Sequence, residues 1–224
     1  MPCMADRRAK TALYDAFAVV AQALASGRRA ELVEVLAQGE RSVEDAAAEI
    51  GQSVANTSQH LRVLARAGVA TSRRDGNRVL YRLAGGRVEA LWEALRAVAA
   101  EHVAGLDRLA ADYLGDRGGL EHVGREELAR RLAAEGLVVW DVRPSAEFAA
   151  GHVPGAVSVP PGEVRRRLQE LSASTEVVAY CRGPFCVFAD DAVRALTRRG
   201  HLARRLEDGF PEWRRAGLPV AVGK

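Results

Sequence analysis

Two cysteines near the C-terminus are the residues whose type and spacing most directly offer chemistry. Cys181 and Cys186 lie on either side of an Arg-Gly-Pro-Phe turn in the stretch AYCRGPFCV, residues 179–187. Such a pair can hold a metal ion, close a disulfide or present a reactive thiolate. Zinc is not expected, because two cysteines without a neighbouring histidine do not complete a site of four ligands. We therefore expect no metal ion and no cofactor, and the disulfide and the thiolate both stay open.

The composition of the chain favours a chemical role for a thiol over a structural one. The 224 residues are 48% hydrophobic and 27% charged, and the start MPCMADRRAKTALYDAF becomes charged at once, unlike a secretory signal. No apolar run approaches the length that crosses a bilayer. We therefore expect a cytoplasmic protein without a membrane partner. In a reducing compartment its three cysteines, an odd number, do not form a disulfide framework.

The elements that must position these cysteines belong to the second of two predicted domains. The turn-rich stretch GDRGG at 115–119 follows a region in which apolar residues recur at helical spacing. After it, β-rich runs such as LVVW at 137–140 and EVVAY at 176–180 alternate with helical segments, which predicts a parallel sheet with crossover helices. We predict a mostly α-helical domain over residues 1–115 and an α/β domain over residues 120–224.

The first domain contains two short helices followed by a basic hairpin. Residues 42–67 predict two helices with Ser42 and Ser53 as N-terminal caps, and a tight turn at 75–77 predicts the hairpin. The second helix exposes small or polar side chains: Ala55, Ser58, Gln59 and Arg62. Residues 50–87 hold seven arginines against one acid. The positive field of these arginines suits a phosphate backbone, although a basic stretch is often only a solvated surface.

These features, in this order, resemble the winged helix-turn-helix of the ArsR/SmtB family of bacterial repressors, over about residues 11–113. The resemblance includes ALASGRRAELVEVLAQG at 23–39 and SQHLRVLARAGV at 58–69, which is similar to the family's recognition helix. It implies that the helix over 54–67 enters the major groove of a double-stranded DNA operator. The implied contact set is Ala55, Ser58, Gln59, Arg62, Arg73, Arg74 and Arg78.

The same resemblance implies roles within this set and an assembly. Ser58 and Gln59 would read base edges, Arg62 would hold phosphate, and the hairpin arginines would act as the wing. Family members are homodimers, which implies an operator with an inverted repeat. One long helix predicted over 87–113 would suit the dimer interface, or would pack within its own domain.

The first domain departs from its family where metals are usually sensed. The stretch RSVEDAA, at the start of the first helix of the motif, has no cysteine. The acids and the histidine of the last helix do not have the spacing that a zinc site needs: Glu101, His102, Asp107 and Asp112. We therefore expect the effector to be read elsewhere in the chain.

The second domain resembles the rhodanese domains over about residues 120–221. The stretch LVVWDVRPSAEFAAGHVPGAVSVP at 137–160 is similar to the opening signature of that family, and LEDGFPEWRRAGLPV at 206–220 is similar to its closing signature. Asp141, Arg143 and His152 are expected to frame the cysteine loop rather than to react, and Trp140 and Trp213 to lie in the core.

The resemblance implies that Cys181 is a thiolate that accepts sulfane sulfur as a persulfide. A loop between a strand and a helix N-terminus lowers the pKa of a thiol and favours anions. The backbone N–H groups of the loop would cradle the terminal sulfur: those of Arg182, Gly183, Pro184, Phe185 and Cys186. Arg182 would add positive charge at the mouth. Cys186 is either a resolving thiol, which attacks the persulfide to give a disulfide, or a small buried residue at the helix start.

The loop also departs from the best-known sulfurtransferases. Pro184 stands at its fourth position, where they carry glycine, and Cys186 at its sixth, where they carry arginine. Without that arginine, efficient use of anionic thiosulfate is in doubt. A phosphatase on the same fold would need a longer loop closed by arginine, whereas this chain continues with Val187 and Phe188.

Three hypotheses follow for the whole chain. The leading one is a dimeric transcriptional repressor in which a rhodanese-like domain senses reactive sulfur or thiol oxidation, with a sulfane-sulfur donor or an oxidant as partner. The alternative is a sulfurtransferase that passes sulfur from Cys181, with DNA binding in an ancillary or autoregulatory role. In the third, the second domain only docks a partner, and its cysteines have no chemical role.

Overall fold

The computed structural model describes residues 6–133, 136–172 and 174–223. The chain divides into two compact units, residues 1–97 and 98–224. This division falls within helix α5 (Gly86–His102), whereas the predicted boundary lies at the turn-rich residues 115–119. The division within α5 reflects how the residues pack, whereas the predicted boundary reflects a change in composition. The boundary at 115–119 stays a prediction.

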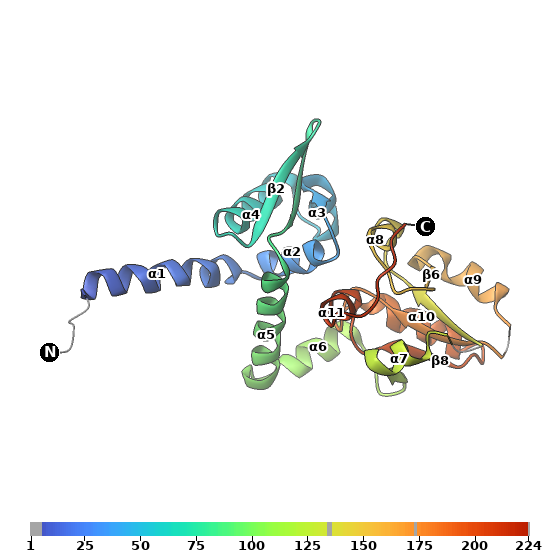
Figure 1. The fold of residues 1–224 in the computed structure, drawn as a ribbon. Helices are drawn as coiled ribbons and strands as arrows, with labels where there is room; N and C mark the ends of the chain where they lie inside the picture. The colour runs from blue at the N-terminus through green and yellow to red at the C-terminus, as the bar shows by residue number, and fades with distance from the viewer. Residues whose placement is uncertain (1–5, 134–135, 173, 224) are drawn as a thin grey trace. The chain divides into compact units, whose positions relative to one another are not determined.

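The first unit packs three of its helices, α2 (Gly27–Ala37), α3 (Val43–Glu49) and α4 (Val54–Arg66), against a small antiparallel sheet (Figure 1). Its other elements besides α5 are α1 (Arg7–Leu24), β1 (Arg41–Ser42), β2 (Ala70–Asp75) and β3 (Arg78–Leu83). The strands lie in the order β1-β3-β2. Leu32, Leu36, Leu61 and Leu64 form part of the core because α2 and α4 each turn an apolar face inward.

Local signals explain the helix-turn-helix and the hairpin. The Ser42 hydroxyl accepts a hydrogen bond from the Asp45 N–H at 3.0 Å, and the Ser53 hydroxyl accepts one from the Asn56 N–H at 3.3 Å. Both predicted caps are therefore confirmed. The hairpin turns at Gly76, where φ is 58°, a value that a glycine adopts without strain.

The predicted helix over 87–113 is wrong as a single element. The structure has α5 and a separate helix α6 (Leu106–Leu114), and Gly105 at the start of α6 has φ of 80°. This left-handed backbone does not continue an α-helix, so the chain turns between the two.

Among the described residues, no helix is long and apolar enough to span a membrane.

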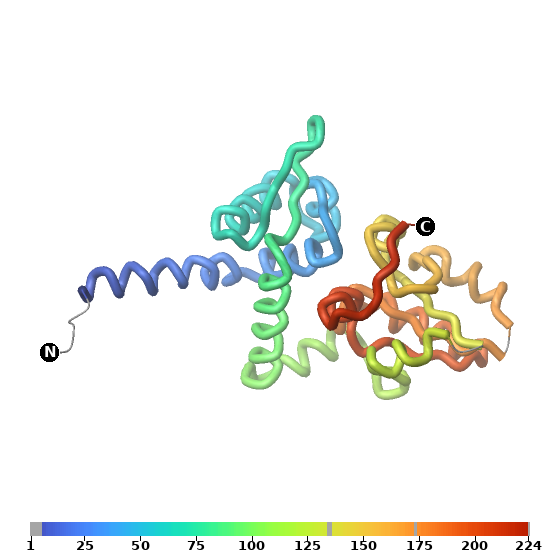
Figure 2. The backbone as a smooth tube through the Cα atoms, viewed as in Figure 1, coloured from blue at the N-terminus to red at the C-terminus, as the bar shows by residue number. Residues whose placement is uncertain are grey.

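The second unit is a parallel sheet with helices on both faces. Its chain path can be followed in Figure 2 by the colours from green to red. Its elements after α6 are β4 (His122–Val123), α7 (Arg125–Arg131), β5 (Leu137–Asp141), α8 (Ser145–Ala150), β6 (Val157–Ser158), the 3-10 turn η1 (Pro161–Glu163), α9 (Val164–Glu170), β7 (Glu176–Tyr180), α10 (Val187–Thr197), β8 (Ala203–Leu206) and α11 (Phe210–Arg215). The five strands, all paired in parallel, lie in the order β4-β8-β7-β5-β6. The predicted fold class is confirmed.

Strand β7 divides its side chains between two cores. Val177, Ala179 and Cys181 pack with residues of α9 and α10, while Val178 and Tyr180 pack with residues of α7 and α11. This alternation is the ordinary result of the pleat of a strand. It places Cys181 on the face that α10 covers.

Candidate functional site

The cysteine loop connects the end of β7 to the start of α10. The Cys181 carbonyl accepts a hydrogen bond from the Phe210 N–H at 3.1 Å, which holds the loop against the start of α11. The Cys186 N–H donates to the Gly183 carbonyl at 3.1 Å and closes a four-residue turn in which proline takes the second position. Cys186 is the N-cap residue of α10, so the loop lies at the positive end of that helix.

The structure joins Cys181 and Cys186 in a disulfide, and their Cα atoms are 6.2 Å apart. Two cysteines at this separation can be bridged without moving the backbone. In this form neither sulfur is a nucleophile, and the Cys181 residue is only 2% exposed. A thiolate at Cys181 would therefore require the reduced form of the same loop.

The predicted cradle of five N–H groups is wrong at Pro184 and incomplete at Cys186. Proline has no N–H to donate. The N–H of Cys186 is directed to Gly183 within the turn. A cradle for a terminal sulfur can therefore use at most three groups, those of Arg182, Gly183 and Phe185. Phe185 lies at the turn with 36% of its surface exposed.

Arg182 does not bring an uncompensated charge to the mouth of the loop. Its Nη2 and Nε donate hydrogen bonds to Oε1 of Glu147 at 2.6 and 3.1 Å. Glu147 lies in α8 with a side chain that is 1% exposed. The expectation that Arg182 adds net positive charge is therefore corrected: the pair is close to neutral, and it joins α8 to the loop.

A buried network supports the base of the loop. Nη2 of Arg143 donates hydrogen bonds to Asp141 at 2.5 Å and to the Gly151 carbonyl at 2.7 Å. Burial acts to lower the pKa of Arg143, but the hydrogen bonds and negative charge of Asp141 outweigh it and raise that pKa. The His152 ring stacks on the Phe148 ring, with centroids 3.7 Å apart. The expectation that Asp141, Arg143 and His152 frame the cysteine loop stays a prediction.

Gly209 brings a second segment into contact with the loop. A Cβ atom at this position would overlap the Gly183 nitrogen and the Arg182 carbonyl group. Only glycine allows this approach without a shift of the backbone. Sequence reasoning missed Gly209 and Glu147 as partners of the loop, although both lie within the quoted signatures.

The second candidate site is the exposed face of α4. Ala55, Gln59 and Arg62 are exposed and Ser58 is half-buried, while the opposite face is buried through Thr57, Leu61 and Leu64. Nη2 of Arg62 donates to the Ser58 hydroxyl at 2.9 Å. Arg62 and Ser58 are therefore coupled, because moving either side chain breaks this hydrogen bond.

The hairpin presents its arginines beside this helix. Arg73 and Arg74 lie in β2 and Arg78 lies in β3, all exposed, on the hairpin that projects from the unit in Figure 1. Arg73 donates to both carboxylate oxygens of Glu40, at 2.6 Å from Nη2 to Oε2. The hydrogen bond to Glu40 raises the pKa of Arg73. Arg74 and Arg78 form no ion pair with the described residues.

Comparison with known proteins decides the family. The model of the bacterial regulatory proteins of the arsR family matches residues 26–72, and that of the rhodanese-like domain matches residues 124–216. The HTH-type transcriptional regulator Rv0324 of Mycobacterium tuberculosis is 44% identical over 223 residues, covering 100% of this chain and 97% of that protein. The chain belongs to the ArsR family. It is an ArsR-family transcriptional regulator with a rhodanese-like domain.

Further similarities divide between the two parts of this ArsR-family chain. A sulfurtransferase of Allochromatium vinosum is 31% identical over 105 residues, which cover 46% of this chain and 96% of that protein. A solved homodimeric winged helix-turn-helix DNA-binding domain from Mycobacterium bovis is 42% identical, covers 46% of this chain and 94% of that one, and has a TM-score of 0.42.

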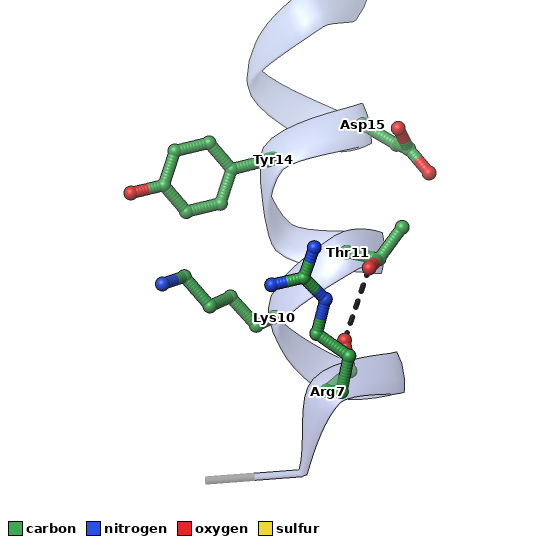
Figure 3. Close-up of a pocket in the computed structure, with 5 residues that line it drawn as sticks. All are labelled: Arg7, Lys10, Thr11, Tyr14 and Asp15. Atoms are coloured by element: carbon green, nitrogen blue, oxygen red, sulfur yellow. Dashed lines mark hydrogen bonds between the residues drawn. The ribbon is translucent and has the colours of Figure 1, made fainter.

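Helix α1 of the ArsR-family chain carries a surface hollow but no reactive group. Its lining residues all lie on the one helix: Arg7, Lys10, Thr11, Tyr14 and Asp15 (Figure 3). The hollow holds about 410 Å³, and the Thr11 hydroxyl is occupied by a 3.0 Å hydrogen bond to the Arg7 carbonyl. No group of three or more His, Cys, Asp or Glu side chains that could hold a metal occurs in the described residues.

Proposed function

We propose that this regulator is a DNA-binding repressor whose cysteine loop senses reactive sulfur or thiol oxidation. The observation that carries the proposal is the pairing of Cys181 with Cys186 at the start of α10, in a chain that also has an ArsR-type helix-turn-helix. Two cysteines that can exchange between dithiol and disulfide provide two states of one loop. A repressor needs two such states if its DNA affinity is to respond to a signal.

The proposed chemistry begins with the reduced loop. The Cys181 thiolate attacks the terminal sulfane sulfur of a hydropolysulfide, the S–S bond of the donor breaks, and the shortened donor leaves with the electron pair. The Cys186 thiolate then attacks Sγ of Cys181, and hydrosulfide leaves. Two thiols have lost two electrons and two protons, and the sulfane sulfur has gained the electrons. A peroxide would reach the same disulfide through a sulfenic acid, with water as the leaving group.

The DNA-binding half of the proposal assigns roles to exposed residues of α4 and the hairpin. Ser58 and Gln59 would meet base edges, with Ala55 at the helix end close to the DNA, and Arg62 would meet phosphate. Arg74 and Arg78 would meet the backbone beside the major groove, joined by Arg73 once it leaves Glu40. The chain would act as a homodimer on an inverted repeat.

The test compares DNA affinity between the two states of the loop. An operator is first selected from a random DNA pool with the reduced full-length protein. Its dissociation constant is then measured in dithiothreitol and after polysulfide treatment, for the wild type and for Cys181→Ser. We expect a change of about fivefold or more in the wild type, the lower end of ordinary coupling between sites, and none in Cys181→Ser.

Matched variants identify the cysteine that matters. Cys3→Ser removes the third thiol and should respond like the wild type, while Cys186→Ser should keep a persulfide but form no disulfide. An unchanged affinity in the wild type, with the disulfide verified by mass spectrometry, would refute the sensing proposal.

The second candidate is a sulfurtransferase, favoured by the 31% identity to a protein of that name. Against it stand the Arg182–Glu147 pair, which is close to neutral, and Cys186 at the sixth loop position, so neither of these two positions offers an uncompensated cation to thiosulfate. Turnover of thiosulfate or 3-mercaptopyruvate with cyanide as acceptor, lost in Cys181→Ser, would support it. Absence of turnover with both donors would count against it.

A further inference from the structure

Arg117 lies in the 115–119 segment and reaches the cysteine loop. Its Nη1 donates a hydrogen bond to the Pro184 carbonyl at 2.8 Å, and its Nε donates to Oδ2 of Asp190 at 2.6 Å. Pro184 belongs to the turn between the two cysteines, and Asp190 belongs to the first turn of α10. One side chain therefore bridges the turn and the helix that follows it.

Three charged side chains meet in the interior at this contact, and we call them the Asp190 cluster: Arg117, Asp190 and Arg205. The Asp190 side chain is fully buried, and Nε of Arg205 lies 3.0 Å from its Oδ1. Burial lowers the pKa of Arg205, the charge of Asp190 opposes this effect, and the charge of Arg117 adds to it. Two cations thus share one carboxylate, and Nη2 of Arg117 is buried without a hydrogen-bond partner among the described residues.

The backbone of the 115–119 segment is held by the same helix. Nη2 of Arg194, in α10, donates to the Asp116 carbonyl at 2.7 Å. The Asp116 carboxylate accepts the Gly118 N–H at 2.8 Å, and the Leu120 N–H donates to the Arg117 carbonyl at 3.0 Å. The segment therefore has a defined conformation, and it follows directly on α6.

Resting on the proposed function, we infer that Arg117 is a positioning residue that couples the disulfide state of the cysteine loop to the conformation of residues 115–119. When the disulfide is reduced, the sulfurs of Cys181 and Cys186 separate from bonding distance to van der Waals distance, so the turn that joins the two residues moves. Asp190 is held in α10 and paired with Arg205, so it does not move with the turn. Opening the loop therefore separates the two acceptors of Arg117, and the segment rearranges.

This coupling acts in both directions. If the disulfide favours the bridged position of Arg117, the bridge must favour the disulfide by the same factor. The bridge holds Pro184 in the turn that keeps Cys181 and Cys186 at a bonding distance. Loss of the bridge should shift the loop toward the dithiol.

The experiment measures both directions in the full-length chain. The disulfide is equilibrated with dithiothreitol, whose two thiols supply two electrons and two protons and close their own ring, and the dithiol fraction is read by alkylation and mass spectrometry. We expect Arg117→Gln to shift this equilibrium about fivefold or more toward the dithiol. Hydrogen exchange of residues 115–120 should rise on reduction in the wild type and be high in both states of Arg117→Gln.

Two further variants separate positioning from general stability. Arg117→Lys can pair with Asp190 but cannot reach both acceptors through a planar fork, so it should fold and still shift the equilibrium. Arg166→Gln removes an exposed arginine of α9 that pairs with Glu163 and Glu170, and it should leave both readouts unchanged.

Each outcome bears on the inference separately from the sensing proposal. The inference would be overturned if hydrogen exchange of residues 115–120 were equal in the reduced and the oxidised wild type. It would also be overturned if the dithiol–disulfide equilibrium of both Arg117 variants were that of the wild type. Hydrogen exchange of residues 115–120 could change on reduction in the wild type but not in Arg117→Gln, while DNA affinity stays the same with and without the disulfide. This result would support the coupling and refute the proposed sensing.

Discussion

Asp141 connects separate parts of the rhodanese-like domain through one carboxylate. It accepts hydrogen bonds from Arg143 and, at 2.5 Å, from the Tyr180 hydroxyl, which itself accepts the Val153 N–H at 3.1 Å. The side chains of this network are buried. A buried ion pair is tolerated only when its remaining polar atoms are hydrogen-bonded, as they are here. The network therefore fixes the end of β7, and with it the position of Cys181.

Tyr180 gives this network a pH dependence. Burial, together with the charge of Asp141, raises the pKa of Tyr180 above its ordinary value of 10.0. Above pH 10 the unfolded chain releases a proton that the folded chain keeps, so stability is complete below this pH and falls as pH rises. The slope of this loss approaches about 1.4 kcal/mol per pH unit for one proton.

We expect Tyr180→Phe to remove this share of the alkaline slope. Its free energy of unfolding, from urea titrations between pH 7 and 11, should be lower than that of the wild type throughout, because two hydrogen bonds are lost. The difference should be constant from pH 7 to 9 and should narrow above pH 10. A constant difference over the whole range would contradict the raised pKa.

At the scale of elements, the loop before α11 limits how the cysteine loop can move. Gly209→Ala would place a methyl group against the backbone of residues 182 and 183. We expect a loss of about 1–3 kcal/mol in unfolding free energy from urea titration, the usual cost of overpacking, and faster alkylation of reduced Cys181 as the loop is displaced. Gly162→Ala is the control, because a Cβ there meets nothing within 4 Å. Equal unfolding free energies and equal alkylation rates in the two variants would contradict the close packing of Gly209 against the cysteine loop.

The wing of the first unit has an internal competitor for DNA. Glu40 holds Arg73 through three hydrogen bonds, so a DNA phosphate that bound Arg73 would have to displace Glu40. We expect Glu40→Gln to raise affinity for DNA about two- to tenfold at low salt and to steepen the salt dependence by about one counterion. Glu44→Gln, which removes the same charge from an exposed position, is the control. If both variants raise affinity equally, general charge and not Arg73 is responsible.

Local patterns predicted the elements well. Helix caps, the hairpin turn and the alternation in β7 depend on residues within a few positions of each other, which is why the helix-turn-helix and the parallel sheet could be predicted. The break between α5 and α6 was missed, since an apolar stripe continues across Gly105.

Partners of the cysteine loop could not be predicted in the same way. Glu147 is 35 positions from Arg182, and Arg117 is 67 positions from Pro184. Contacts at such separation depend on the packing of the sheet and leave no periodic signal. The prediction of a net positive charge at Arg182 was wrong for this reason, because the carboxylate that compensates it belongs to Glu147 in another element.

At the scale of the whole molecule, one route by which a two-state loop could act on DNA binding is the assembly of two chains. Of α1, only Ala23 and Leu24 are buried, and the rest of the helix extends away from its unit (Figure 1). Leu13, Tyr14 and Phe17 are each more than half exposed, and Leu91 and Leu95 of α5 are also exposed. An apolar surface of this kind is typical of a protein interface.

We expect Phe17→Asp to weaken the proposed homodimer and DNA binding together. A charge at a fully buried interface position costs several kcal/mol, so the dimer should dissociate at micromolar concentration in sedimentation experiments. An inverted repeat is bound by two half-sites at once, so operator affinity should fall with dimer content, and raising the protein concentration should partly restore it. Val222→Asp, on an exposed residue of the other unit, should change neither property. The dimer would be contradicted if the wild type sediments as a monomer and binds the operator no more tightly than Phe17→Asp. Loop chemistry would then have to act within one chain.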